Sequence, residues 1–594
     1  MTARQHRPTA RLAAALLAST ALLSYATISV AQPVPFPATA AGAQELEARQ
    51  AALVDTFRVA AYAPAVADWL LSHSVSLDGD GYVVSMPGLD FELPLPALRE
   101  QGIFFTYAPM RWSLRPGTDG AVNIAMDEIK ADMSSHAFDM TMAFSGLSSQ
   151  WHRRENPADG TVNVQSQETM AMDMTMTAGR GQQATMAIGE SNTTYTLTDF
   201  DEMWRGERGA SLSALIDRLL TADEVTTSAL HTDLTDWLTT TRWGQLNSQG
   251  QAKDFVHRQT GPGMTFEHRD SIADTVIVKG STAEHWFATL DGTTTDIQVN
   301  AELPFGSIAF DFDRLEQHFE LGGVDTQAHN QLLALLVQGL FADGYHETAG
   351  NLPFAETLIT DLIDRGPVSL LGPVSFTMAL DNVWGRGDII GAGPSDSTFD
   401  RLAMSASWTP NAQGAVTASI GTSLAGLTVD NGLIPATAAP LLPSRFDLAL
   451  TADGLLIDKV LQASFEQEQP MNPSPSEIIT RWTTEDSGVV ISMGGATAGG
   501  ASFTLDGDLR FDPTGEPFVN GTLVANVVGI DAMIEAMGQL SSQLPQASVG
   551  AMGLSVMKGF GVPETLDDGT TSYRYELTVS PATGVQVNGT ALPL

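Results

Sequence analysis

The sequence contains no cysteine, and beyond its N-terminus it has no apolar run long enough to span a lipid bilayer. Without cysteine the chain can form no disulfide framework, thiol nucleophile, thiolate metal site or iron–sulfur cluster. A chain without disulfides must be stabilised by its core, and 43% hydrophobic residues among 594 are sufficient to build one. We therefore expect no cofactor and no metal.

Positive charge is also scarce. The chain has 30 lysine and arginine residues against 69 aspartate and glutamate residues, which gives a formal net charge of −39 at pH 7. Nucleic acids and anionic lipid surfaces are bound through basic faces, so this balance argues against both. We expect a solvated acidic surface and no nucleic-acid partner.

The common catalytic motifs are absent. The chain has no His-Glu-x-x-His, no P-loop and no dinucleotide fingerprint, and Gly421–Gly426 has the wrong spacing for a nucleophile elbow. Ser555 and Lys558 match the Ser-x-x-Lys of penicillin-binding proteins, but the accompanying Ser-Asp-Asn and Lys-Thr-Gly are missing. We name no catalytic residue and predict that the protein is not an enzyme. A hydrolase whose site forms only in the fold is the alternative.

The N-terminus has the three parts of an export signal. Its positive region holds Arg4, Arg7 and Arg11, and an apolar region follows over 12–28. Small residues at Ser29 and Ala31 then predict cleavage between Ala31 and Gln32, with delivery to the bacterial periplasm. A membrane anchor is the alternative, but the run is shorter than the ~20 apolar residues that a spanning helix needs. We expect no integral membrane protein after cleavage.

The rest of the chain divides by composition and periodicity. Residues 32–43 are rich in proline and alanine and predict a disordered lead-in. Residues 44–325 predict a β-rich region with a helical insertion near 202–242, and residues 326–594 predict a second β-rich region with helix pairs. Neighbouring strands joined by short turns favour antiparallel pairing. The predicted fold class is β-rich α+β, an extended and mainly antiparallel sheet, curved or groove-like, flanked by amphipathic helix pairs.

Alternating residues predict an apolar sheet face near the start of the first β-rich region. Large apolar side chains occupy every second position of two segments, and smaller or more polar residues lie between them. The candidate face consists of Phe138, Met140, Met142, Phe144, Met170, Met172, Met174 and Met176. Thioethers also bind Cu(I), but same-face residues of one strand lie ~6.6–7 Å apart, too far to share one ion easily. Packing against helices or a lipid-like ligand is the favoured role.

The last hundred residues resemble a known family. Residues 501–512 (ASFTLDGDLRFD) predict paired strands, residues 529–537 (GIDAMIEAM) a helix, and residues 573–589 (YRYELTVSPATGVQVNG) a closing hairpin. This order, near 500–594, resembles the bacterial proteins grouped as domain of unknown function 2125. The segment 376–384 (FTMALDNVW) is similar to another part of those proteins. More loosely, the pattern resembles the repeats of AsmA-type envelope proteins, which implies a long sheet with an apolar groove.

These observations predict a non-enzymatic protein of the cell envelope. It would bind a lipid or other apolar small molecule, or an envelope protein partner, on an apolar sheet face. A structural or assembly protein without a ligand is the first alternative, and an unrecognised hydrolase is the second. The resemblance implies no catalytic residue, because the family has no established activity.

Overall fold

The structure is a computed structural model of the 594-residue chain. It describes residues 34–592 with internal gaps, at 57–63, 94–102, 136–139, 157–160, 179–181, 201–205, 221–226, 242–243, 262–263, 280–284, 346–354, 367–369, 390–392, 412–413, 432–436, 460–479, 513–517 and 568. The predicted signal segment, with Ala31 and Gln32, lies outside the described residues, as does Phe138.

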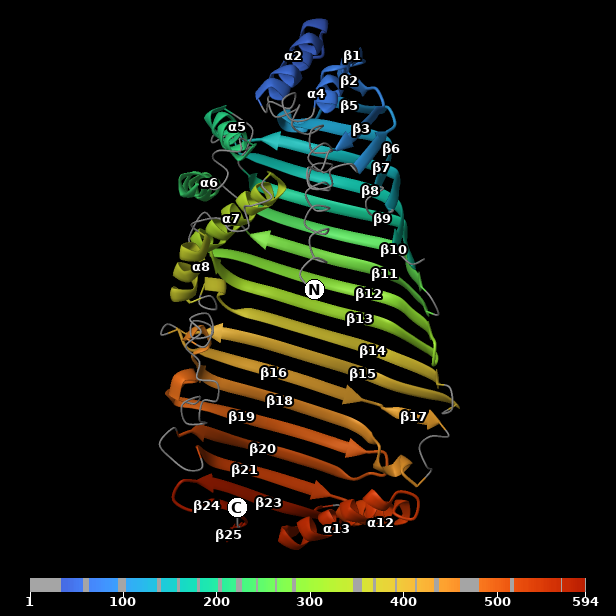
Figure 1. The fold of residues 1–594 in the computed structure, drawn as a ribbon, viewed down its shortest axis with the longest axis vertical. Helices are drawn as coiled ribbons and strands as arrows, with labels where there is room; N and C mark the ends of the chain where they lie inside the picture. The colour runs from blue at the N-terminus through green and yellow to red at the C-terminus, as the bar shows by residue number, and fades with distance from the viewer. Residues whose placement is uncertain are drawn as a thin grey trace. The chain divides into compact units, whose positions relative to one another are not determined.

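The chain forms two compact units. The first contains residues up to 262 together with 271–288 and 324–361, and the second contains 263–270, 289–323 and 362–594. Residues of strands β11 (Met264–Lys279) and β12 (His285–Leu303) and of helix α8 (Ala355–Asp364) belong to both units. Each unit is built on antiparallel strands, which Figure 1 shows as successive ribbons within it.

The sheet of the first unit pairs strands in the order β1–β2–β5–β6–β7–β8–β9–β10. Strand β4 pairs with the C-terminal part of β6, and β3 pairs with β4. These strands are β1 (Ser74–Asp78), β2 (Gly81–Met86), β3 (Leu89–Leu93), β4 (Ile103–Tyr107), β5 (Met110–Pro116), β6 (Val122–Ser135), β7 (Met140–Glu155), β8 (Val162–Ala178), β9 (Gln182–Phe200) and β10 (Gln245–Gly261). A turn at Asp78–Gly81 joins β1 to β2.

Two cores stabilise the first unit. At its start, Tyr82, Trp112 and Leu114 on adjacent strands are almost completely buried. Helices α2 (Ala40–Thr56) and α4 (Pro64–Leu71) lie near these strands, and the Tyr82 hydroxyl donates to the Pro35 carbonyl. Because α2 begins at Ala40 and Val34 is buried, part of the segment expected to be a disordered lead-in at 32–43 is ordered by contact with the sheet.

The second core lies among three helices. Helices α5 (Gly206–Leu220), α6 (Ser228–Thr240) and α7 (Thr326–Tyr345) bury leucines against one another, with Leu230 fully inaccessible. Thr227 caps α6, since its side chain accepts a hydrogen bond from the amide of Leu230. These helices occupy the predicted insertion near 202–242 and the segment after 326. Among the described residues, every helix is too short or too polar to cross a bilayer.

The sheet of the second unit pairs strands in the order β13–β14–β15–β16–β18–β19–β20–β21–β23–β24–β25, with β17 beside β15 and β22 beside β23. These strands are β13 (Gly306–Asp325), β14 (Val374–Ile389), β15 (Gly393–Pro410), β16 (Val416–Ala425), β17 (Thr428–Asn431), β18 (Pro443–Leu455), β19 (Thr483–Thr497), β20 (Ser502–Phe511), β21 (Val519–Val528), β22 (Val562–Thr565), β23 (Thr571–Ser580), β24 (Gly584–Val587) and β25 (Thr590–Ala591).

Two helices follow β21. The segment 530–560 is two helices, α12 (Ile530–Leu540) and α13 (Pro545–Phe560), because the chain leaves the helix after Leu540 and Pro545 starts the next one. The helices pack on each other. The prediction of a β-rich, mainly antiparallel fold is confirmed, and the sheet is large and open. The finer expectation, that amphipathic helix pairs flank that sheet, is not established.

Candidate functional site

Strand register gives the sheet of the second unit one apolar face. Directly paired residues on neighbouring antiparallel strands share a face, and alternate residues of a strand face opposite sides. Nine strands, β13 to β16, β18 to β21 and β23, therefore align their apolar residues in rows. We call the following set the apolar face: Leu315, Leu380, Leu402, Leu424, Phe446, Phe503, Val527 and Tyr573; Met378, Met404, Leu448, Met493 and Leu505; Phe319, Phe376, Ile420, Leu450, Ile491, Leu523 and Leu577.

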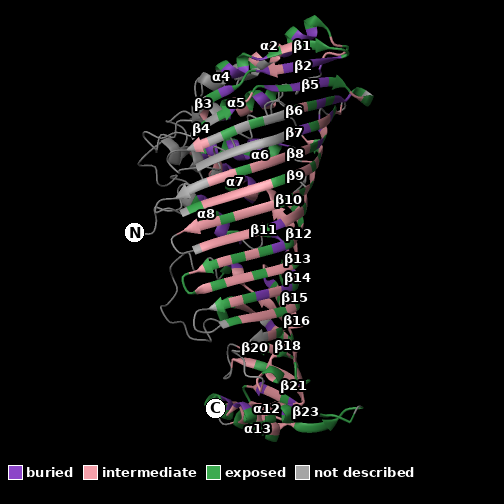
Figure 2. Cartoon of the chain, turned by 90° about the vertical axis from the view of Figure 1, so that its right-hand side faces the viewer, coloured by how far each residue is buried: buried purple, intermediate pink, exposed green. Residues whose placement is uncertain are grey.

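The apolar face is open in its middle. Ile420 on β16 is 57% exposed and Met404 on the adjacent β15 is 46% exposed. Most other members of the face are half-buried rather than buried, and Figure 2 shows β14, β15 and β16 mainly in the colours of intermediate and exposed residues. An apolar sheet face normally packs on a core. A large apolar patch that stays accessible is typical of a binding surface.

The opposite face of the same sheet is polar. Ion pairs join residues two apart on one strand, as in Arg445 with Asp447 at 2.6 Å and Arg510 with Asp508 at 3.1 Å. Arg401 on β15 also pairs with Asp381 on β14 at 3.0 Å. Because these pairs are exposed, they contribute little to stability. They show which face of the sheet the sequence has adapted to water.

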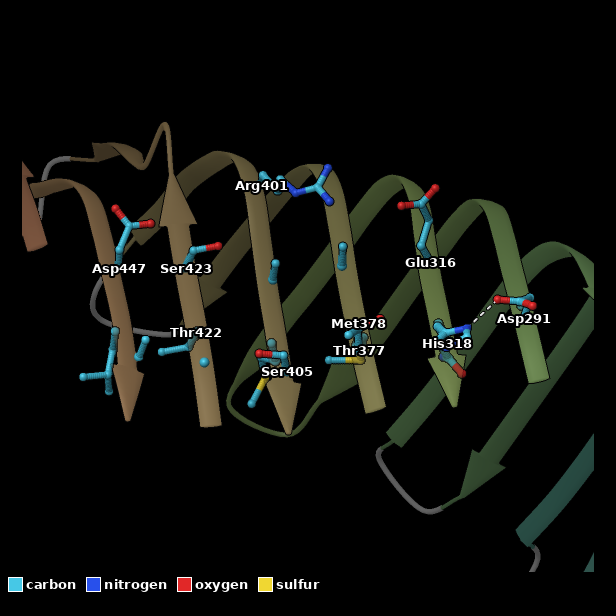
Figure 3. A pocket seen from close by; sticks show the side chains of 18 of the residues that line it. Asp291, Glu316, His318, Thr377, Met378, Arg401, Ser405, Thr422, Ser423 and Asp447 are labelled. Carbon is cyan, nitrogen blue, oxygen red and sulfur yellow. Dashed lines mark hydrogen bonds and ion pairs between the residues drawn. The ribbon is translucent and has the colours of Figure 1, made fainter. Parts of the chain in front are cut away.

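A cavity of about 610 Å³ lies along the central strands of this unit. Its lining includes polar-face side chains such as Glu316, Arg401 and Asp447, with Met378 and Met404 of the apolar face. Figure 3 shows Glu316, Met378, Arg401, Ser423 and Asp447 coming from successive strands of the sheet. Small residues on the polar face make room for the cavity, for example Gly421, where an added Cβ would lie 2.5 Å from the Ser405 hydroxyl.

The cavity contains a histidine–carboxylate pair, which bears on the hydrolase alternative. His318 Nδ1 lies 2.6 Å from Asp291 Oδ1, the contact drawn dashed in Figure 3. The register places Thr377 opposite His318. A general base would need its second nitrogen directed at a hydroxyl. Here Nε2 lies 3.9 Å from Glu320 Oε2, so the ring lies between two carboxylates, and its side chain is 38% exposed. This geometry is that of a partly exposed histidine held between surface carboxylates.

The face predicted from sequence lies in the first unit. Met140, Met142 and Phe144 belong to β7, and Met170, Met172, Met174 and Met176 belong to β8. The register pairs Met142 with Met174, and Met174 with Met186 on β9. Met170, Met172 and Met174 are half-buried. Methionines also stand in the apolar face of the second unit, at Met378, Met404 and Met493, so they fit the role of adaptable apolar residues in both sheets.

A carboxyl group interrupts the β8 row. Glu168 has the same strand parity as Met170, Met172 and Met174. Burial raises its pKa, and hydrogen bonds from side chains that include Tyr195 and Ser166 oppose the rise. Burial likewise raises the pKa of Tyr195 to about 12. A polar cluster of this kind fixes the register of β8 and β9, because a one-residue slip would leave the carboxyl without its partners.

Sequence reasoning located the strands of the larger apolar face but did not select them as the site. The alternating runs Phe376–Leu380, Leu402–Trp408 and Phe446–Leu450 have the two-residue period of strands, and the structure places them in β14, β15 and β18. What was missing is the pairing order, which aligns these runs in one register. The unusual number of successive alternating segments in 374–528 was the available signal.

Comparison with known proteins gives few matches. Among curated proteins there is no match. Among solved structures, the chain has a 10% identical match, with a TM-score of 0.16, to the outer membrane transporter YddB from Escherichia coli, and the alignment covers 83% of this chain and 73% of that one. A likeness this slight supports no inference about fold or function.

A family described as "Uncharacterized protein conserved in bacteria (DUF2125)" matches residues 361–580. The match extends upstream of the segment near 500–594 that carried most of the resemblance, and it includes residues 376–384. It covers β14 to β23 with α12 and α13, which is most of the sheet that bears the apolar face. Over residues 361–580 the chain is therefore similar to the DUF2125 family of uncharacterised bacterial proteins, which supports the resemblance found in the sequence.

Proposed function

We propose that this protein is a non-enzymatic, lipid-binding protein of the bacterial periplasm, and that the apolar face of the second unit holds the acyl chain of its ligand. The observation that supports this is the exposure of Met404 and Ile420 in the middle of a face built from nine strands. Burying a CH₂ group contributes about 0.8 kcal/mol, so an acyl chain laid across several of these rows gains substantial free energy.

The chemistry of the face favours an acyl chain over a rigid ligand. Its rows mix leucine and phenylalanine with the flexible Met378, Met404 and Met493, which adapt to chains of different length and saturation. Paired strands are about 4.8 Å apart, so a chain crossing the strands meets a new side chain at each step. The predicted N-terminal export signal supports the periplasmic assignment, and the acidic composition argues against a nucleic-acid ligand.

The proposal is tested with a fluorophore at one position, which the absence of native cysteine makes simple. Ile420→Cys on the apolar face and Val490→Cys on the polar face are each labelled with an environment-sensitive dye. Val490 is the matched control, because it is an apolar residue of similar exposure, 42%, whose partner in the register is Asp508. Palmitate is then added below the concentration at which it forms micelles.

We expect a blue shift and an intensity gain from the dye at position 420 and no change at position 490. Ile420→Glu should also abolish binding of a fluorescent fatty acid, whereas Val490→Glu should leave it unchanged, because a carboxylate on the apolar face stays costly to bury. Equal responses at the two positions, or none at either, would show that the face is not a lipid site. The structural or assembly alternative predicts that second outcome.

A further inference from the structure

Helix α13 presents its large apolar side chains to solvent. Val549, Met552 and Val556 are 70%, 68% and 56% exposed, and Phe560 is 41% exposed. At 100° per residue these four side chains fall within one stripe about 80° wide. The segment 544–566 holds eight of the twenty-one exposed large apolar residues in the described part of the chain. Scattered apolar residues on a surface are ordinary, but a concentration of this kind is typical of an interaction surface.

The opposite side of α13 explains why the apolar stripe faces outward. The helix packs on α12 through small residues: Ala547 is buried, and a Cβ added at Gly550 would lie 3.4 Å from the Met537 sulfur. A helix that served only to cover a core would place its bulky residues inward and its small ones outward. In α13 the buried Ala547 is small while the stripe is bulky and exposed, so the stripe is available for another surface.

The C-terminal end of α13 lies against the apolar face. Lys558 Nζ is 5.5 Å from the centre of the Tyr573 ring, and Tyr573 belongs to that face. A Cβ added at Gly561, just after the helix, would lie 2.8 Å from the Tyr575 ring. At 100° per residue Lys558 lies on the side of α13 opposite the stripe, so this contact with the sheet leaves the stripe exposed.

The charges near the stripe indicate which kind of lipid surface, anionic or zwitterionic, the stripe can contact. Lys558 forms an ion pair with Asp531, and Arg574, opposite Val562 in the register, forms one with Glu576. Glu535, Glu564 and Asp567 add further negative charge near the helix. An anionic surface would be repelled by this arrangement. A zwitterionic lipid surface would not be, and it accepts a shallow apolar helix face.

We infer that the apolar stripe of α13, formed by Val549, Met552, Val556 and Phe560, inserts into the surface of a zwitterionic lipid bilayer. This insertion places the end of the apolar face next to the membrane that supplies the ligand. That the membrane supplies a ligand rests on the proposed function. That α13 contacts the membrane rests on the exposure and packing of the helix. Helix α13 is thereby assigned as the membrane-contacting element of this protein.

The test places a dye in the stripe. Val556→Cys and the control Val490→Cys are labelled with an environment-sensitive fluorophore, and phosphatidylcholine vesicles are added to the full chain. We expect a blue shift and protection from an aqueous quencher at position 556, and neither at position 490. A lower response with vesicles that contain phosphatidylglycerol should follow from the local carboxylates. An unchanged spectrum at position 556 with phosphatidylcholine would overturn the inference.

A second set of variants separates this inference from the lipid-binding proposal. The triple variant Val549→Ser, Met552→Gln, Val556→Ser should float with vesicles less than the parent chain does, and it should still bind a fluorescent fatty acid free in solution. Ile420→Glu should do the reverse. Both variants keep the same N-terminus, so a difference between them in vesicle flotation or in fatty-acid binding comes from α13 or from the apolar face. If the triple variant instead dissociates a dimer, without any vesicle association by the parent chain, a second copy of the chain occupies the stripe and the inference is wrong.

Discussion

At the scale of single residues, two glycines of α12 have opposite roles. Gly529 begins the helix with φ 75°, and a Cβ there would lie 2.9 Å from the Ala501 Cα. Gly538 lies inside the helix with nothing within 4 Å of an added Cβ. Gly529→Ala should cost about 1–2 kcal/mol or more, because a left-handed conformation is unfavourable for alanine. Gly538→Ala should instead stabilise by about 0.5–1 kcal/mol.

Urea unfolding of both variants, followed by circular dichroism, measures these changes. A lower midpoint for Gly529→Ala together with a higher one for Gly538→Ala supports the described start and packing of α12. Equal shifts in one direction would mean that the turn before α12 is built differently.

Glu168 should make stability depend on pH. Because burial raises its pKa in the folded chain, the folded state favours the protonated form more than the unfolded state does. That advantage is present below the ordinary pKa of glutamate and is lost as the pH rises through the raised value. Glu168→Gln should therefore stabilise the protein at pH 7 and have less effect in acid. Thermal melts across this pH range measure the difference.

Asp173→Asn provides the control for Glu168, because Asp173 is exposed and faces the other side of the same strand. As the replacement of an exposed side chain, it should change the free energy of unfolding by no more than about 0.5 kcal/mol. If Glu168→Gln gave the same change at every pH, the carboxyl would not be buried as described.

At the scale of elements, the sequence predicted the type and approximate position of helices and strands better than the residues at which they begin and end. Alternating residues identified β14, β15 and β18, and 3.6-residue spacing placed the helices near their observed positions. Helix ends depend on local contacts that the pattern does not contain. The packing of Tyr82 against Pro35, for example, goes with the start of α2 inside the segment expected to be disordered.

The three-helix core of α5, α6 and α7 should depend on Leu230. This side chain is fully buried among leucines from the other helices, so Leu230→Ala leaves a cavity that rigid neighbours fill only in part. We expect a loss of about 2–5 kcal/mol in the free energy of unfolding. Leu332→Ala on α7 is the control: Leu332 is 49% exposed, and its loss should cost within about 0.5 kcal/mol. Similar losses for both would contradict the packing described for these helices.

At the scale of the whole molecule, the candidate site is a property of register rather than of any one residue. The apolar rows exist because nine strands pair in a fixed order, and a one-residue slip of any strand would turn its apolar residues to the polar side. Sequence patterns give the parity of each strand but not its partner. This is why the sequence predicted a smaller face on β7 and β8 and did not select the larger one.

The central claim is that an acyl chain lies on the apolar face, and photo-cross-linking tests it most directly. A fatty acid with a photoactivatable group in its chain is bound to the protein and irradiated, and the labelled peptides are identified by mass spectrometry. We predict labels at apolar-face positions of β14, β15 and β16, near Met404 and Ile420, and their loss in Ile420→Glu. Labels spread equally over both faces of the sheet, or confined to the first unit, would contradict it.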